Sequence, residues 1–128
     1  MAAVSGTLRN VVIDQGPYDQ VGVDLRVVKV YFDSNGQNVT SGSDTLDIAS
    51  LGAGIAGFAR DGKTYTPVAA SLVQAYRSGS TNVFGTVAIS SGTLVLTPKA
   101  ANFSSNAGVT GASVVDAQFG VSVTCTVA

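Results

Sequence analysis

The segment from Thr81 to Thr97, TNVFGTVAISSGTLVLT, constrains the fold of this chain more than any other. A two-residue loop at Ser91-Gly92 would fold it into a β-hairpin whose paired side chains match in size and chemistry. Because side chains alternate along a strand, one face of this ribbon is apolar. The predicted pairs are Ser90–Thr93, Ile89–Leu94, Ala88–Val95, Val87–Leu96 and Thr86–Thr97.

Composition extends this prediction to the whole chain. The 128 residues include 20 Val, 7 Leu and 15 Gly, a bias that favours strands joined by tight turns over helices. A chain of this length buries about two thirds of the surface of its unfolded form. We therefore expect a single all-β or mainly β domain over residues 1–128, an antiparallel sandwich or a small barrel. Residues 1–10 are a candidate for an N-terminal arm that reaches a neighbouring subunit.

Alternating apolar side chains predict further strands on both sides of the hairpin. The first is expected over residues 4–14 and ends in a turn at Gly16-Pro17, and the second over residues 21–33. Asn35-Gly36 predicts a hairpin turn that sets Val39 opposite Phe32. Two more are expected over residues 45–51 and 113–127. The last has Val121, Val123, Cys125 and Val127 on one face.

One helix is expected, near residues 67–78. Pro67 suits the first helical position, Gly79 follows the last turn, and an apolar stripe runs from Val68 to Tyr76. A strand through Leu72 and Val73 is the competing interpretation. Elsewhere, residues 52–57 are expected to be irregular, residues 58–65 to form a tight hairpin around Asp61-Gly62, and Pro98 to end the ribbon.

The glycines Gly52, Gly54 and Gly57 form a literal GxGxxG after an expected strand. A dinucleotide site needs a helix that opens at this loop and an acidic residue about 20 positions later. Pro67 interrupts such a helix, and residues 62–115 contain no acidic residue. We therefore predict no cofactor, and we interpret the glycines as a flexible loop or as closely packed backbone.

Asp33, Asn35 and Asp44 occupy the first, third and twelfth positions of a calcium-loop pattern. The glycine stands at the fourth position, whereas the sharp turn of such a loop needs it at the sixth. The twelfth ligand is also Asp where a bidentate Glu is usual. An Asn-Gly hairpin explains the same residues, so we predict no metal site.

The chain contains no His, Glu or Trp, so it cannot form a Ser-His-Asp or Cys-His arrangement. Asp44 and Asp47 are the one close acidic pair, and strand alternation puts them on opposite faces. Cys125 shares its face with three valines and is best interpreted as a small buried hydrophobe. We therefore predict a non-enzymatic protein with no catalytic residues and no small-molecule substrate.

Charge is scarce and unevenly distributed. The net charge is −1 and 12% of residues are charged, against ~25% in ordinary soluble domains. Binding to nucleic acid or to an anionic membrane is therefore not expected. Residues 78–128 contain only Lys99 and Asp116 as charged residues. Such a surface favours permanent burial against neighbours, since short side chains lose little entropy on ordering, and we expect a homo-oligomer.

The first ten residues lack the basic and apolar regions of a secretory signal, and no run of about 20 apolar residues could span a bilayer. The single Cys125 excludes an internal disulfide, which fits a reducing site of synthesis. We therefore expect a protein that is made in a cytoplasm.

In overall style the chain resembles small virion proteins of tailed bacteriophages, especially capsid decoration or cement proteins. Stretches such as DGKTYTPVAAS and SSGTLVLTPKAANF carry this resemblance. It implies a symmetric oligomer, with a trimer favoured, that sits on the capsid surface of the virion and bridges subunits of the major capsid protein. No residue role is implied.

Another task for the same fold is a tail, neck or fibre component, or an adhesin module that binds host glycans through exposed aromatic rings. The candidate rings are Tyr18, Tyr31, Tyr65 and Tyr76. Sugar sites commonly place carboxylates near such rings, and Tyr18 beside Asp19 is the clearest case. A turn with a partly packed ring is the favoured explanation of Tyr18.

Overall fold

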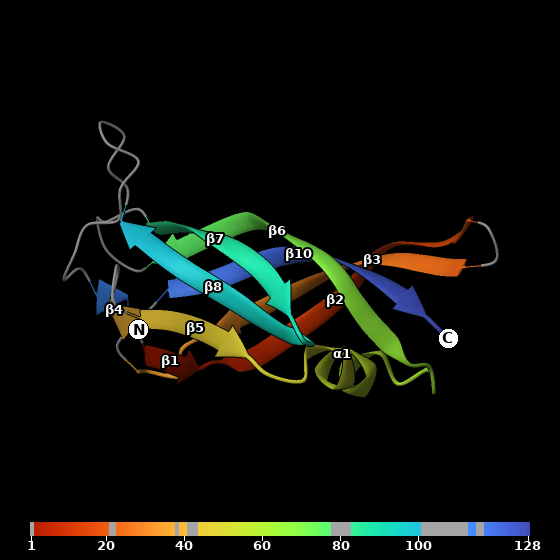
Figure 1. Cartoon of the computed structure of the whole chain (residues 1–128), viewed down its shortest axis with the longest axis horizontal. Helices are drawn as coiled ribbons and strands as arrows, with labels where there is room; N and C mark the ends of the chain where they lie inside the picture. The colour runs from red at the N-terminus through yellow and green to blue at the C-terminus, as the bar shows by residue number, and fades with distance from the viewer. Residues whose placement is uncertain are drawn as a thin grey trace.

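Two four-stranded β-sheets face each other in the computed structural model of this chain, and one short helix lies beside them (Figure 1). The structure describes residues 2–20, 23–37, 39–40, 44–77, 83–100, 113–114 and 117–128. The mainly β prediction is confirmed, and the two separate sheets select the sandwich from the two expected architectures.

The first sheet has the order β1-β5-β8-β7, formed by β1 (Ala2–Ser5), β5 (Asp44–Ile48), β8 (Thr93–Ala100) and β7 (Val83–Ser90). The second has the order β2-β3-β10-β6, formed by β2 (Thr7–Gln20), β3 (Val23–Asp33), β10 (Ala117–Val127) and β6 (Tyr65–Arg77). A two-stranded sheet joins β4 (Val39–Thr40) to β9 (Ser113–Val114). Strands β1 and β5 run parallel, and the other pairs are antiparallel.

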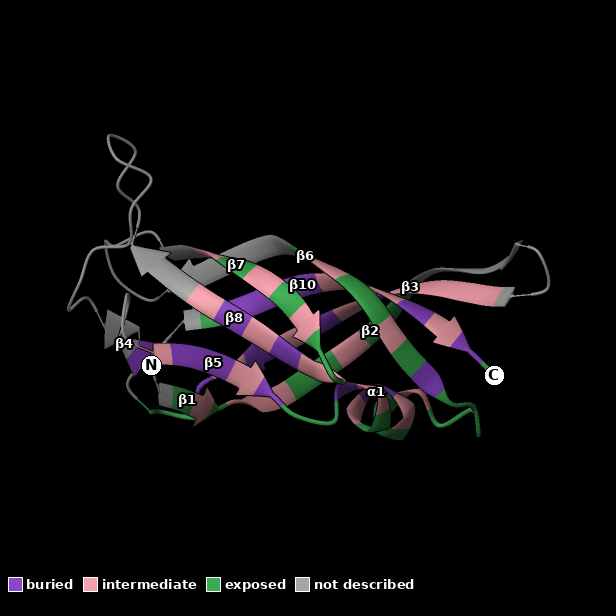
Figure 2. Cartoon of the chain, viewed as in Figure 1, coloured by how far each residue is buried: buried purple, intermediate pink, exposed green. Residues whose placement is uncertain are grey.

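The core lies between the two large sheets. Alternate residues of β8 are buried, as Figure 2 shows by their colour, and the rings of Phe32 and Phe119 stack at 5.7 Å between centroids. Burying each large apolar side chain contributes about 1.5–3 kcal/mol, so these residues supply most of the driving force for folding. Fully buried members include Leu46, Leu94 and Leu96 from the first sheet, Val28, Val30, Val121 and Val123 from the second, and Leu51 and Ile55 from the helix.

The β7–β8 hairpin is confirmed rung by rung, because all five predicted pairs form. Ser91 and Gly92 both have positive φ, at 49° and 79°, as a two-residue hairpin loop requires. The prediction that Pro98 ends the ribbon is wrong, because Pro98 pairs with Gly85 and β8 continues to Ala100. The pairs between β8 and β5 stop at Leu96, so Pro98 has a ladder on one side only, where a missing N–H is tolerated.

Pro17 and Pro67 also lie inside strands, which corrects two predictions. No turn forms at Gly16-Pro17, because β2 runs on to Gln20 with a register shift between Gln15 and Tyr18. The helix predicted near residues 67–78 is the strand β6, as the competing interpretation held. Both prolines belong to outermost strands of the second sheet, beside irregular pairing, where a strand accommodates proline.

The helix α1 (Leu51–Ala59) forms where an irregular segment was predicted. Leu51 and Ile55, four residues apart, are both fully buried, so packing outweighs the poor helix propensity of three glycines. The expected 58–65 hairpin is also wrong, because Arg60 ends the helix with a left-handed cap and its N–H donates to Ala56 O. Tyr65 then begins β6.

The Asn35-Gly36 turn is confirmed, with φ of 53° and 78° and a hydrogen bond from Gln37 N to Ser34 O of 3.1 Å. Val39 does not return opposite Phe32, because both sides of β3 are already occupied by β2 and β10. It pairs with Val114 instead.

Within residues 1–10, considered as an arm, Ala2–Ser5 form β1, which pairs with β5 of the same chain, and Thr7 begins β2. Gly6 then leads from the first sheet to the second, and its N–H donates to Asp47 O at 2.8 Å. A Cβ at this position would lie 2.7 Å from Ile48 Cδ1 and 3.0 Å from Asp33 O. The crossing between the sheets therefore needs a residue without a side chain.

Candidate functional site

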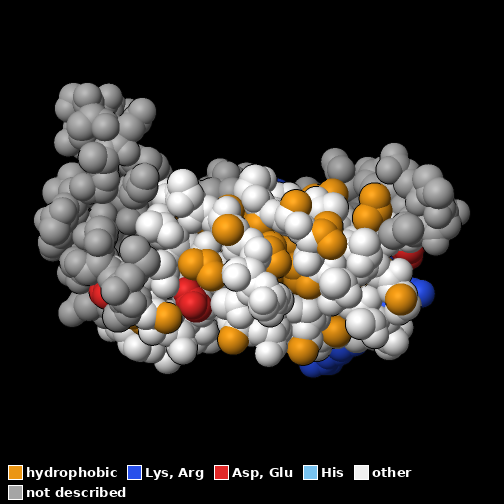
Figure 3. Space-filling view, viewed as in Figure 1, with side chains coloured by type: hydrophobic (Ala, Val, Ile, Leu, Met, Phe, Trp, Pro, Cys, Tyr) orange, Lys and Arg blue, Asp and Glu red, His pale blue; other side chains and the backbone are white. Residues whose placement is uncertain are grey.

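The outward-facing side chains of the first sheet form a surface of small, almost uncharged residues, which we call the low-charge face. It lies on the near side of the molecule in Figure 3, over β5, β7 and β8, where charged side chains are sparse. Strand pairing places ten residues on it: Ala3 and Ser5 of β1, Thr45 and Asp47 of β5, Thr93, Val95 and Thr97 of β8, and Thr86, Ala88 and Ser90 of β7.

Half of the ten residues of the low-charge face are exposed to solvent, and Thr45 is buried. Thr86, Ala88 and Ser90 are exposed, and the β8 residues are half-buried. Among these ten residues Asp47 is the one that is charged, and one of its carboxylate oxygens accepts a hydrogen bond from Thr45 Oγ1 at 2.9 Å. Covering this face would bury few charges and would order only short side chains, so association costs little here.

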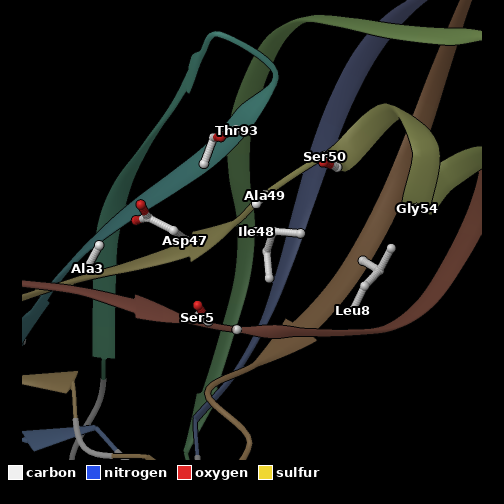
Figure 4. Close-up of a pocket in the computed structure, with 10 residues that line it drawn as sticks. Ala3, Ser5, Leu8, Asp47, Ile48, Ala49, Ser50, Gly54 and Thr93 are labelled. Atoms are coloured by element: carbon white, nitrogen blue, oxygen red, sulfur yellow. The ribbon is translucent and has the colours of Figure 1, made fainter.

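A hollow of about 400 Å³ opens at one corner of the low-charge face, between β1, β5 and the start of α1 (Figure 4). Figure 4 shows Asp47, Ser5 and Thr93 on neighbouring strands, with Ser50 and Gly54 on the helix side. Four of the ten face residues line the hollow, namely Ala3, Ser5, Asp47 and Thr93. The face and the hollow are thus one continuous surface, which is concave beside α1.

A second group of polar side chains, which we call the Arg26 cluster, surrounds the half-buried Arg26 of β3. Its Nη1 donates to Tyr65 Oη at 2.9 Å and to Asp61 Oδ2 at 3.1 Å, and its Nη2 donates to Asp24 Oδ2 at 3.4 Å. The guanidinium also lies 5.7 Å from the centre of the Tyr65 ring. These contacts tie the loop after α1 to β3, so the cluster is interpreted as structural.

Electrostatics within the cluster follow from its hydrogen bonds. Tyr65 Oη donates to Asp61 Oδ2 at 2.6 Å. This bond, with the Lys63 N–H and Arg26, outweighs partial desolvation and lowers the pKa of Asp61 below 3.8. Burial, reinforced by the bond to Asp61, raises the pKa of Tyr65. Both groups keep their neutral-pH protonation states, so neither is poised for acid–base catalysis.

The residues weighed from sequence do not converge on one site. Gly52 lies in α1 against Tyr65 O, which confirms closely packed backbone at that position. Asp33 binds the Arg9 guanidinium, and Asp44 and Asp47 lie on opposite faces of β5, as predicted. Cys125 is fully buried, and burial raises the pKa of its thiol to about 11.

Among the described residues, no group of three His, Cys, Asp or Glu side chains is placed to hold a metal ion. The same residues include no helix of the length and hydropathy needed to cross a bilayer.

The four candidate tyrosines have different environments. Tyr65 is 3% exposed and serves the Arg26 cluster, so its ring offers no platform to a ligand. Tyr31 is partly exposed on the outer face of the second sheet and lines a smaller hollow. The side chains of Tyr18 and Tyr76 lie outside the described residues.

The shortage of charge after residue 78 indicated six of the ten residues of the low-charge face. It did not indicate the contribution of β1 and β5, since Ala3, Ser5 and Thr45 lie in the half of the chain that holds most of the charged residues. The sequence predicted a strand over residues 45–51, but not that β1 would extend the same sheet. Comparison of the chain with known protein families, with curated proteins and with solved structures finds no match.

Proposed function

We propose that this protein is a non-enzymatic virion structural protein, a decoration or cement protein that stabilises a phage head by bridging neighbouring capsid subunits. Its partners would be the major capsid protein and further copies of itself, with a trimer favoured. The observation that carries the proposal is the low-charge face, ten outward-facing residues of one sheet with a single carboxylate among them. A free monomer normally carries mixed charge over its whole surface, which prevents self-association.

The proposed mechanism is mechanical. A protein that binds the assembled lattice but not the separated subunits stabilises the lattice, by about 2.7 kcal/mol per site at a concentration 100 times its dissociation constant. A preformed sandwich suits this task, because little backbone conformational freedom is lost on binding. The hollow beside α1 is a concave part of this face that a side chain of a neighbouring subunit can fill.

Co-sedimentation with expanded empty capsids tests the proposal. The wild-type protein should pellet with the capsids and raise their melting temperature. Ala88→Lys, on the outermost strand β7 of the low-charge face, should reduce the bound fraction at least tenfold, because an ammonium would be desolvated without a partner.

Ala69→Lys is the matched control, since Ala69 is an exposed strand residue outside this face. It should bind like the wild type. Equal binding by Ala88→Lys and the wild type would refute the role of the face, and failure of the wild type to pellet would refute the proposed function.

A further inference from the structure

A second hollow, of about 280 Å³, opens on the outer face of the second sheet and is lined by Arg9, Asn10, Tyr31, Phe32 and Gln118. Phe32 is 1% exposed with its ring in the core, so its main chain forms part of the floor. Asn10 and Tyr31 are direct partners across β2 and β3. The hollow therefore combines one aromatic ring with three polar side chains.

A β-bulge directs Arg9 into this arrangement. Leu8 pairs with Phe32 and Asn10 pairs with Tyr31, so Arg9 is an extra residue without a partner on β3. Its Nε and Nη2 donate to the two Asp33 carboxylate oxygens at 3.0 and 3.1 Å, and Nη2 also donates to Asn35 Oδ1 at 3.1 Å. Bulges commonly re-aim side chains beside binding sites. The Arg9 side chain is therefore held in place beside the hollow, and Asp33 neutralises its positive charge.

The rung that carries Tyr31 also contains a glycine. Gly120 of β10 lies directly opposite Tyr31, and the pairing between β10 and β6 becomes irregular just after it. A glycine inside a central strand weakens the sheet, and it often marks a place where another group approaches closely. Tyr31 thus stands between the short amide of Asn10 and a position with no side chain.

The polar groups of the hollow remain available to a ligand. Asn10 Oδ1 accepts a hydrogen bond from Val11 N at 2.9 Å, which leaves the amide nitrogen as a donor. Within the described part of the chain, no hydrogen bond engages Tyr31 Oη or the Gln118 amide. These groups offer both donors and acceptors, which matches a ligand rich in hydroxyl groups. An anionic ligand gains little, because Asp33 already pairs with Arg9.

We propose that this hollow binds a neutral pyranose ring, with the apolar face of the sugar against Tyr31 and its hydroxyls bonded to Asn10 and Gln118. The site lies on the second sheet, away from the low-charge face, so both surfaces can be occupied together. The inference does not depend on the proposed function, since sugar binding is measured on the isolated protein.

Saturation-transfer NMR of the wild-type protein tests this site with the methyl glycosides of glucose, galactose, mannose and N-acetylglucosamine. At least one should receive saturation, with a dissociation constant of about 1 mM, as expected for one ring on one platform. A comparison of chitotriose with the N-acetylglucosamine glycoside distinguishes a glycan chain from a free sugar as the source of the pyranose ring. Tighter binding of the trimer indicates a glycan chain and equal binding indicates a free sugar, and either result supports the site.

Two variants locate the binding. Tyr31→Ala should abolish saturation transfer, and Gln118→Ala, at an exposed position that leaves the fold intact, should weaken binding about tenfold. Gln37→Ala removes another exposed glutamine, outside the hollow, and should bind like the wild type. The proposal is overturned if the folded wild type transfers saturation to none of the sugars, or if Tyr31→Ala and Gln118→Ala bind unchanged.

Discussion

Arg26 and Arg9 each pair with aspartate, but in very different surroundings. The Arg26 side chain is 14% exposed and contacts Asp24, Asp61 and Tyr65, whereas the Arg9 side chain is 47% exposed. Removing one partner of a buried pair strands the others in a region of low dielectric, whereas exposed pairs contribute little. The two residues therefore allow a direct comparison of half-buried and exposed ion pairs in one fold.

Arg26→Met should lower the free energy of unfolding by about 2–3 kcal/mol, because it leaves two carboxylates and a hydroxyl without their shared donor. Arg9→Met should lower it by less than about 1 kcal/mol. Urea unfolding at neutral pH measures both values. Equal losses in the two variants would contradict the structural role assigned to the Arg26 cluster.

Asp61 gives this cluster a dependence on pH. Its folded-state pKa lies below 3.8, so its contribution to stability is fully present above the unfolded value and is lost as pH falls through the folded value. The Asp61→Asn variant has no ionisable side chain at this position. The stability difference between wild type and Asp61→Asn should therefore be constant from neutral pH to about pH 4 and shrink below it. Urea unfolding across this range checks the prediction, which a constant difference down to the acid limit would refute.

At the scale of elements, strands with uninterrupted alternation were predictable. The register of β7 and β8 followed from matched side chains and a two-residue loop, and the buried face of β10 followed from Val121, Val123, Cys125 and Val127. Over residues 85–97 of the hairpin and 121–127 of β10, buried side chains alternate with more exposed ones or lie on one face. In these cases the local pattern and the tertiary environment favour the same structure.

Elements whose formation depends on distant partners were not predictable. The spacing of Val68, Leu72 and Val73 resembles a helix because two register shifts, at Val68 and at Val73, break the two-residue period of β6. The glycine-rich segment forms α1 because Leu51 and Ile55 reach the core, which no local propensity indicates. The Asn35-Gly36 turn was correct, but its returning strand was not, since both edges of β3 are occupied.

The glycines of α1 give a prediction at this scale. A Cβ on Gly52 would collide with Tyr65 O, whereas a Cβ on Gly57 would meet no atom within 4 Å. Gly57→Ala should therefore stabilise the protein by about 0.5–1 kcal/mol through helix propensity. Gly52→Ala should destabilise it by at least about 1 kcal/mol, because main chain has to move. Urea unfolding compares them, and stabilisation by both substitutions would contradict the packing of α1 on β6.

At the scale of the whole molecule, the proposed function rests on the uneven distribution of charged residues. The shortage of charge after residue 78 was visible in the sequence, but its meaning depends on the fold. Strand alternation divides β7 and β8 into a core side and a solvent side, and β1 and β5 add small residues to the solvent side. The hollow at Tyr31 required the β2 bulge and the β3–β10 register, neither of which a local pattern predicts.

Sedimentation velocity of the purified protein, from micromolar to millimolar concentration, tests most directly whether the low-charge face is an assembly surface. We expect one discrete oligomer for the wild type and for Ala69→Lys, and a shift to monomer for Ala88→Lys at the same concentrations. A wild-type protein that remains monomeric throughout this range would contradict the account.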